Sequence, residues 1–342
     1  MTHDLTSAPK TDPLNIYRYR DSLYAVDLIT AALSLDFFTW LAENPSSLQG
    51  ICAHFGFKER PVDVMLTLFT ANEWVRPDGG GVFHATEKAK EHLCAGSVWE
   101  LRPYYASLHE RPIARDYLDV LKTDKPAGWS GDKAAFDWHK AMEQEDFARK
   151  FTAAMDCRGL YLSQALAKAL DLSGRSCLLD IGASSGIYAC AITAQHPHMK
   201  AVAFDQVPVD RIAMKLIEER GCAERVSVTT GNMFDGLPEG CDVHLYSNVL
   251  HDWGVPEVRK LLAVSHAALP VGGMLVIHDA FINAAKNGPP HVAEYSCLLM
   301  HSTQGKCYSV GEYAALLEEA GFTAGEYHDT AVARGFMTAV RR

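Results

Sequence analysis

Short apolar runs alternate with helical periodicities throughout the second half of the chain. The runs typical of strands are Cys177–Ile181, Ala201–Phe204, Val226–Thr229, Val243–Tyr246, Met274–His278, Thr323–Tyr327 and Phe336–Val340. Helical spacing of apolar positions falls between them, near Gly186–Gln195, Pro208–Arg220, Pro256–Ala268 and Val310–Ala320. Strands that alternate with helices predict an α/β fold, a Rossmann-like doubly wound parallel sheet covered on both faces.

The first hundred residues have a different pattern, mostly helical and followed by a short β wing. Apolar positions recur at helical spacing over Leu23–Leu41, and a second helix is expected to end at Gly56. A third helix covers Arg60–Asn72, and an Asp-Gly turn predicts a hairpin over Trp74–His84. This order is typical of a winged helix. We therefore expect a winged-helix domain over residues 1–100, a helical segment over 101–172 and a sheet domain over 173–342.

The middle segment is rich in aromatic and methionine side chains, with a loop expected at Trp129–Gly131. Such a stripe at helical spacing is most often helix core. The alternative is the wall of an apolar substrate cavity, for which Met142 and Met155 are the candidates. The pattern by itself leaves both interpretations open.

The charge balance argues against a nucleic-acid partner. The 342 residues carry 32 Lys and Arg against 42 Asp and Glu, a net charge of −10, whereas phosphate binding favours the opposite sign. The helix Arg60–Asn72, which would enter a DNA groove, is dominated by apolar residues. We expect the winged helix to serve in packing or dimerisation instead. Because Leu23–Leu41 is too apolar to be covered by one small domain, we expect a homodimer.

Cysteine usage and the N-terminus suggest the compartment. The nine cysteines are an odd number, scattered and without a C-x-x-C pair, which is typical of reduced thiols and gives no sign of a metal site. Residues 1–13 lack the apolar core of a signal peptide. No apolar run reaches the roughly 18 residues of a membrane helix. We expect a cytoplasmic protein without a membrane partner.

The strand that ends in Asp180-Ile-Gly182-Ala-Ser-Ser-Gly186 runs into a glycine-rich turn that opens a helix. A doubly wound sheet binds nucleotides at this point. A dinucleotide fingerprint would require glycines where Ser184 and Ile187 stand, so the close approach to a pyrophosphate is not provided. The next strand ends in Asp205, whose carboxylate can accept both ribose hydroxyls of an adenosine. The combination fits an adenosine ligand without a diphosphate, of which S-adenosylmethionine is the common one.

The third and fourth strands also end in polar residues. Gly231-Asn-Met-Phe234 follows the third, and Ser247-Asn-Val-Leu-His251-Asp-Trp253 follows the fourth. The carboxyl ends of parallel strands form the edge on which ligands bind. A lone histidine is usually structural, but one that directly follows an apolar strand on this edge is a candidate for catalysis.

The sequence resembles class I O-methyltransferases, in the subgroup shared by plant phenylpropanoid and bacterial polyketide-tailoring enzymes. The resemblance rests on DIGASSG (180–186), FD (204–205), GNMF (231–234), NVLHDW (248–253), LPVGGMLVIHD (269–279) and EYAALLEEAGF (312–322). It covers nearly the whole chain, including the winged helix, which in that family is a dimerisation domain. The resemblance implies methyl transfer from S-adenosylmethionine to a hydroxyl of a small aromatic molecule.

The resemblance also implies roles for single residues. His251 is the general base that deprotonates the acceptor hydroxyl, and Asp279 orients it. Gly182 lines the methionine part of the cofactor, Asp205 holds the ribose, and Asn232 and Met233 flank the adenine. The complete set of candidate cofactor-binding residues is Asp180, Gly182, Asp205, Gln206, Asn232, Met233, Phe234 and Ser247. The candidates for acceptor binding are Met142, Met155 and Asp252.

Three positions depart from the family pattern. Asn232 stands where the family has an aspartate, although its amide oxygen can still accept a hydrogen bond. Ser247 replaces a frequent lysine or arginine, and Cys307 replaces a carboxylate. Two alternatives to the O-methyltransferase interpretation follow. One is methylation at carbon, or another S-adenosylmethionine-dependent reaction, with His251 only binding or structural; the other is a ligand- or DNA-binding regulator built on the winged helix.

Overall fold

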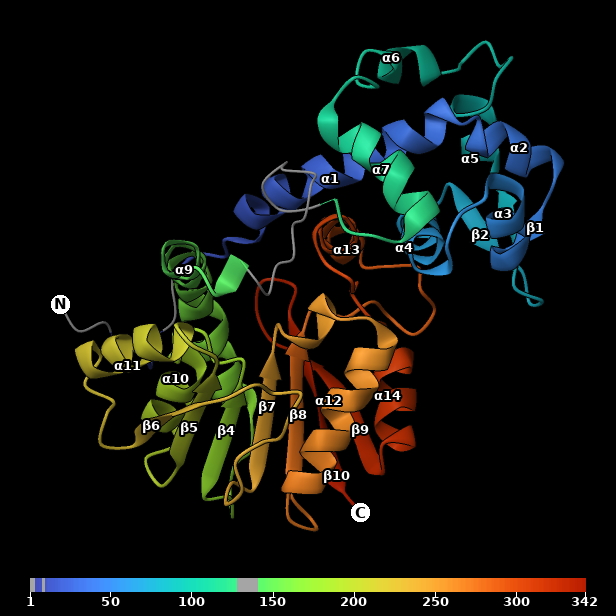
Figure 1. The fold of residues 1–342 in the computed structure, drawn as a ribbon. Coiled ribbons are helices and arrows are strands. Elements are labelled where there is room, and N and C mark those ends of the chain that lie inside the picture. The colour runs from blue at the N-terminus through green and yellow to red at the C-terminus, as the bar shows by residue number, and fades with distance from the viewer. Residues whose placement is uncertain (1–3, 8–9, 128–140) are drawn as a thin grey trace. The chain divides into compact units, whose positions relative to one another are not determined.

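The computed structural model of the chain describes residues 4–7, 10–127 and 141–342, which form two compact units, each discontinuous in sequence. The described parts of Met1–Leu14, Asp137–Phe281 and Val310–Arg342 make the sheet unit, and those of Asn15–Phe136 and Ile282–Ser309 make the helical unit (Figure 1). The sequence predicts domain boundaries at residues 100 and 172, whereas the two units do not divide at either position. The loop expected at Trp129–Gly131 lies outside the described residues.

The sheet unit contains every strand expected in the second half of the chain. The strands are β4 (Cys177–Ile181), β5 (Lys200–Asp205), β6 (Val226–Thr230), β7 (Val243–Ser247), β8 (Met274–Asp279), β9 (Phe322–Asp329) and β10 (Gly335–Arg341). They pair in the order β6-β5-β4-β7-β8-β10-β9 within the described residues. The central strands β4 and β7 are mostly apolar, and Leu178, Leu179 and Leu245 are fully buried, as expected for strands covered on both faces. The predicted doubly wound sheet is confirmed.

One part of the sheet differs from the all-parallel prediction. Strands β6, β5, β4, β7 and β8 are parallel, but β10 runs antiparallel to both β8 and β9. The reason is the connection between β9 and β10, residues 330–334. It is far too short for the crossover of a dozen or more residues that parallel strands require.

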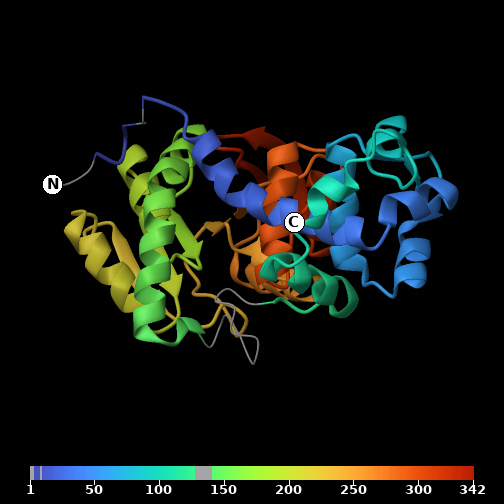
Figure 2. The same cartoon turned by 90° about the horizontal axis from the view of Figure 1, so that it is seen from above.

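Helices cover the two faces of the sheet (Figures 1 and 2). The helices α9 (Glu145–Ala169), α10 (Ile187–Gln195) and α11 (Val209–Glu219) pack together beside β4–β6, while α12 (Val255–Ala268) and α14 (Val310–Glu319) pack together on the side of β7–β10. The helices that connect β4 to β5 and β5 to β6 run one way along the sheet and the helix that connects β7 to β8 runs the other way, so right-handed crossovers place the two sets on opposite faces. The short 3-10 helix η1 (Leu250–Asp252) follows β7 at the carboxyl edge.

Gly186, at the start of α10, gives a test of this packing. Its φ is +71°, and an added Cβ would lie 2.7 Å from Cδ1 of the buried Ile217. Gly221 has nearly the same φ, +70°, but an added Cβ there would meet nothing within 4 Å. We expect Gly221→Ala to cost about 1–2 kcal/mol from backbone strain and Gly186→Ala about 2–4 kcal/mol, because overpacking is added. Urea unfolding of both variants measures the difference, and equal losses would contradict this account of the turn.

The helical unit contains the elements expected for a winged helix. Its described helices are α1 (Leu14–Ser34), α2 (Phe37–Glu43), α3 (Leu48–Phe55), α4 (Glu59–Ala71), α5 (Glu87–His92), α6 (Arg102–Ala106), α7 (Pro112–Thr123) and α13 (Pro290–Ser302), and its strands are β1 (Ser46–Ser47), β2 (Val75–Pro77) and β3 (Val82–Ala85). The predicted hairpin is present as the antiparallel pair β2–β3. Gly56 ends α3 in the left-handed conformation, with φ 69°, as expected.

Two features of the helical unit were not foreseen. Helix α13, from much later in the chain, packs on α4 and α7. In addition, most of the apolar segment Leu23–Leu41 is buried within this chain: Leu28, Phe38 and Leu41 are inaccessible. The apolarity of that whole segment therefore does not require a second copy. The large apolar side chains left exposed on α1 are Ile16, Tyr19 and Leu23.

In the described residues, no single helix combines the length and apolarity of a membrane span. Helices α1 and α2 meet those criteria only when they are counted together, and the chain bends by 59° between them.

Candidate active site

The turn after β4 and the end of β5 meet through Asp205. One carboxylate oxygen of Asp205 accepts the backbone N–H of Ser184, and the other accepts that of Gln206, both at 2.8 Å. Burial raises the pKa of Asp205 to about 6. Gly182 has φ +69°, and an added Cβ there would lie 3.0 Å from Val249. The glycine therefore lets the turn pass close to the loop that carries His251.

Asp180, at the end of β4, has a structural role. Its Oδ2 accepts the backbone N–H of Ala189 at 3.2 Å, inside the first turn of α10. Burial, with a smaller contribution from Asp205, raises the pKa of Asp180 to about 7. The carboxyl group thus satisfies one of the unpaired amides at a helix N-terminus.

The glycine turn also contains two buried serine hydroxyl groups. Among the described residues, the buried hydroxyl oxygens of Ser184 and Ser185 have no hydrogen-bond partner. Buried polar groups are nearly always satisfied by protein, water or ligand. Together with the buried carboxylate of Asp205, these hydroxyls fit a ligand that is polar and carries hydroxyl groups, as the sequence predicts for this edge.

The segment after β6 holds the residues expected beside an adenine. The Oδ1 of Asn232 accepts the backbone N–H of Phe234 at 3.0 Å, so this amide closes its own turn. The Phe234 ring contacts Trp253 edge-on, with centroids 4.5 Å apart, and Lys260 Nζ lies 5.4 Å from the Phe234 centroid. Met233 is half-buried between Asn232 and Phe234. The structure therefore brings this segment to the loop that contains Trp253.

His251 and Asp279 form a buried pair at the carboxyl ends of β7 and β8. His251 is 2% exposed and Asp279 is 1% exposed. His251 Nδ1 is hydrogen-bonded to Asp279 Oδ1, which also accepts the backbone N–H of Ala280 at 2.7 Å. Because an ionised carboxylate can only accept, the imidazole proton belongs on Nδ1 and the lone pair on Nε2. The arrangement is that of a base with an orienting acid.

The charges around this pair keep Asp279 ionised. Burial raises the pKa of Asp279, but the His251 ring and then Arg334 outweigh it and hold the pKa below its usual value. Tyr313 donates its hydroxyl to Asp279 Oδ2 at 3.4 Å. On the other side of the ring, Asp252 Oδ1 lies 3.6 Å from His251 Nε2, and burial raises the pKa of Asp252 to about 6.

Ser247, predicted to contact the cofactor, is engaged inside the protein. Its hydroxyl is hydrogen-bonded to His278 Nδ1 at 2.8 Å and accepts Asn248 Nδ2 at 3.1 Å. Burial lowers the pKa of His278 to about 3, so this ring is neutral. Sequence reasoning missed His278 and Asn248, although both stand inside the motifs NVLHDW and LPVGGMLVIHD.

The predicted acceptor-binding methionines lie on or near α9. Met142 is buried with Ala148 and Val209 in an apolar cluster against which Phe147, Phe151 and Ile212 also pack. Met155 is half-buried on α9. A role of either residue in acceptor binding stays a prediction. Cys307, in the helical unit, is buried, and its backbone N–H donates to Ser296 Oγ at 3.1 Å.

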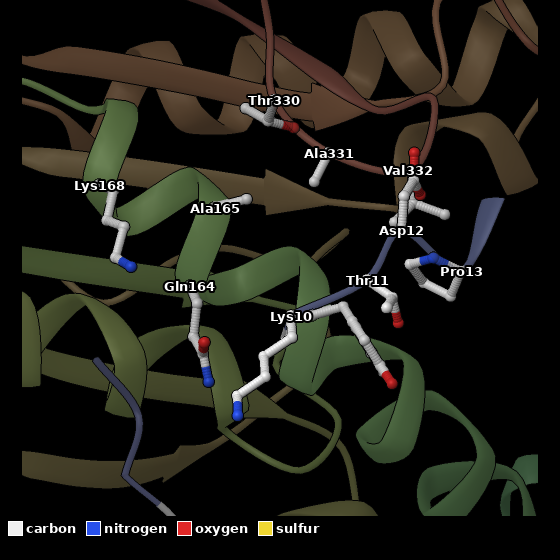
Figure 3. A pocket seen from close by; sticks show the side chains of 11 residues that line it. Lys10, Thr11, Asp12, Pro13, Gln164, Ala165, Lys168, Thr330, Ala331 and Val332 are labelled. Carbon is white, nitrogen blue, oxygen red and sulfur yellow. The ribbon is translucent and has the colours of Figure 1, made fainter. Parts of the chain in front are cut away.

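A separate cavity of about 390 Å³ lies in the sheet unit. It is lined by Lys10–Pro13, by Tyr161, Gln164, Ala165 and Lys168 of α9, and by Thr330–Val332 (Figure 3). None of the site residues predicted from the sequence lines it. In the described part of the chain, no three His, Cys, Asp or Glu side chains are grouped so that they could hold a metal ion.

Comparison with known proteins agrees with this geometry. Residues 122–323 match the model of a family described as an O-methyltransferase domain. The 3-hydroxy-5-methyl-1-naphthoate 3-O-methyltransferase of Streptomyces sahachiroi is 28% identical, over 87% of this chain and 86% of its own. The N,N-dimethyltransferase OxyT of Streptomyces rimosus is also 28% identical, over 92% of each chain.

A solved structure matches the whole chain. It is an O-methyltransferase family 2 protein from Planctomyces limnophilus in complex with apigenin. It is 26% identical, with a TM-score of 0.88, and the match covers 100% of this chain and 99% of that one. Because the family model spans more than half of the sequence, the chain belongs to the O-methyltransferase domain family, whose methyl donor is S-adenosylmethionine.

Proposed function

We propose that this protein transfers a methyl group from S-adenosylmethionine to a hydroxyl of a small aromatic molecule, with His251 as the general base. The observation that carries the proposal is the buried His251–Asp279 pair at the ligand edge of the sheet. A histidine held in this way has a fixed orientation and a fixed tautomer. Its Nε2, which carries the lone pair in this tautomer, can accept a proton.

In this reaction the protein aligns the acceptor and removes a proton from it. The bound donor supplies a methyl group that its sulfonium already activates. The chain must align the acceptor oxygen and remove its proton. His251 Nε2 accepts that proton, and the carboxylate of Asp279, bound to Nδ1, stabilises the imidazolium that forms. Orientation of the reactants lowers the activation barrier by up to about 7–11 kcal/mol. A positioned base accelerates the reaction by a further factor of about 10²–10⁴.

The residues proposed to hold the donor lie on the neighbouring strand ends. Asp205 would accept the ribose hydroxyls, and Gly182 with Ser184 and Ser185 would line the amino-acid portion.

The acceptor class is supported by the relatives. The Streptomyces sahachiroi enzyme is named for a hydroxynaphthoate, and the Planctomyces protein binds apigenin. OxyT, in contrast, is named for methylation at nitrogen, so the acceptor atom must be measured. The test is incubation with phenolic acceptors and donor labelled in its methyl group. We expect S-adenosylhomocysteine and a methyl group bound to oxygen by NMR; a methyl on carbon or nitrogen would contradict the proposal.

We also propose that the protein is a homodimer through α1. Its exposed apolar side chains Ile16, Tyr19 and Leu23 are 76%, 81% and 50% accessible and are spaced along one face of the helix. Light scattering should give about twice the chain mass of 37.6 kDa. Tyr19→Glu combined with Leu23→Glu should give a monomer, since burying two charges at an interface is costly. Val271→Glu, an equally exposed position in the sheet unit, is the control, and a monomeric wild type would refute the proposal.

A further inference from the structure

Arg334 is a buried cation in the turn between β9 and β10, only 7% exposed. We infer that Arg334 is a positioning residue, which holds Asn248 and thereby the turn that presents His251 to Asp279. The inference rests on the proposed role of His251 as the base. The turn between β9 and β10 would then position the base without contributing a residue to the chemistry itself.

The first support is the set of hydrogen bonds that hold the side chain of Asn248. Arg334 Nε donates to Asn248 Oδ1 at 3.1 Å. The Nδ2 of the same amide donates to the hydroxyls of Tyr188 at 3.2 Å and Ser247 at 3.1 Å, and the backbone N–H of Asn248 donates to the carbonyl of His278 at 2.9 Å. Both ends of this side chain are therefore fixed.

Asn248 is the residue at which the chain leaves β7. Its φ is 53°, in the left-handed region that residues other than glycine seldom adopt. The 3-10 helix η1, which carries His251, follows directly. A change in the Asn248 conformation would therefore redirect His251 relative to Asp279, which is fixed on β8.

The second support is the construction of the turn. The backbone N–H and the hydroxyl of Thr330 both donate to the carbonyl of Arg334, at 2.8 and 2.9 Å. Val332 and Ala333 have φ values of 53° and 56°, and for a β-branched residue this conformation is strained. Figure 3 shows Thr330, Ala331 and Val332 at the wall of the cavity, whereas Arg334, at the end of the same turn, is hydrogen-bonded to Asn248. The turn therefore combines a strained backbone with a buried hydrogen bond to the residue that follows β7.

The third support is charge. Arg334 contributes, after His251, to keeping the pKa of the buried Asp279 low. The other ionisable groups that face the pair are Asp252 of η1, Tyr313 of α14, His278 of β8 and Arg158 of α9. Without the charge of Arg334, the carboxylate of Asp279 would bind a proton more readily. The acidic limb of the pH profile would then move to higher pH.

The experiment compares Arg334→Gln, Arg334→Lys and Asn248→Ala. Arg259→Gln is the control, because Arg259 of α12 forms an exposed ion pair with Glu319 of α14. Arg334→Gln should lower kcat about 10²-fold, the cost of a misplacement of about 1 Å. S-adenosylhomocysteine affinity, measured by calorimetry, should stay within about threefold. The acidic midpoint of kcat/KM should rise by about one unit.

The other two variants separate geometry from charge. Arg334→Lys should restore the acidic midpoint but not the full kcat, because ammonium cannot reproduce the Nε contact. Asn248→Ala should lower kcat without moving the midpoint. These two variants decide the question even if Arg334→Gln does not fold: wild-type kcat in both would overturn the inference.

The outcomes distinguish this inference from the proposed function. A lower melting temperature in Arg334→Gln with unchanged kcat and unchanged midpoint would show a structural role only and would overturn the inference. Full turnover in His251→Ala would instead refute the proposed base, whatever Arg334 does. A fall in kcat in Arg259→Gln as large as the fall in Arg334→Gln would also overturn the inference, because the effect would not be specific to the turn.

Discussion

Replacing His251 with alanine is expected to lower turnover by about 10²–10⁴, the usual contribution of a general base. The pair with Asp279 is buried and fixes the orientation of the ring. S-adenosylhomocysteine affinity should stay near that of the wild type, because the proposed cofactor contacts lie on Gly182, Asp205 and Met233. Steady-state kinetics and calorimetry measure the two effects.

His328→Ala is the matched control for this substitution. His328 is an exposed histidine on β9 of the same sheet. We expect its loss to leave turnover unchanged. A fall in cofactor affinity as large as the fall in turnover, in His251→Ala, would mean that the histidine supports the binding site instead of removing a proton.

The second large effect is expected at Asp205. Replacement by alanine removes a carboxylate proposed to accept two ribose hydroxyls, at a cost of about 1.5–3 kcal/mol. Affinity for S-adenosylhomocysteine should therefore fall roughly 10- to 150-fold. Asp235→Ala, an exposed carboxylate just beyond Phe234, is the control. Unchanged binding in Asp205→Ala would remove Asp205 from the site.

The same carboxylate predicts a pH dependence of binding. Burial raises the pKa of Asp205 from its ordinary value to about 6 in the ligand-free protein. Only the ionised form accepts hydrogen bonds from both hydroxyls, so affinity should weaken as the pH falls through about 6. This loss should be absent from Asp205→Ala. A wild-type affinity that is flat between pH 5 and about 7 would contradict the assignment.

The sheet and its ligand edge were predictable because their signals are local. Most strands of the sheet unit contain a short apolar run, and the turn at Gly182 and the carboxylate of Asp205 lie at strand ends. The antiparallel direction of β10 was missed because apolar runs carry no direction. It follows only from the short connection at residues 330–334.

The supporting contacts of the site could not be predicted in the same way. Asn248 and Arg334 lie 86 positions apart in the sequence, and nothing about a single arginine in a turn indicates a buried hydrogen bond. Ser247 was placed against the cofactor by position, but its hydroxyl is hydrogen-bonded to His278 from the neighbouring strand. Such pairings depend on strand register, which the pattern of one strand does not specify.

The interpretation of Leu23–Leu41 failed for a related reason. A long apolar helix indicates burial but not the surface that buries it. Here helix α13, which comes from residues 290–302, contributes to the same helical unit, and Leu28 and Leu41 are buried within the chain. The exposed side chains that support dimerisation are those at the start of α1.

The central claim is that His251 removes a proton from the acceptor hydroxyl. The most direct measurement compares wild type and His251→Ala on two acceptors of similar shape, a phenol that is protonated at the assay pH and one that is already ionised. An ionised acceptor does not need a base. The account predicts a loss of about 10²–10⁴ on the protonated phenol and a much smaller loss on the ionised one, whereas equal losses on both would show that His251 does not act as the base.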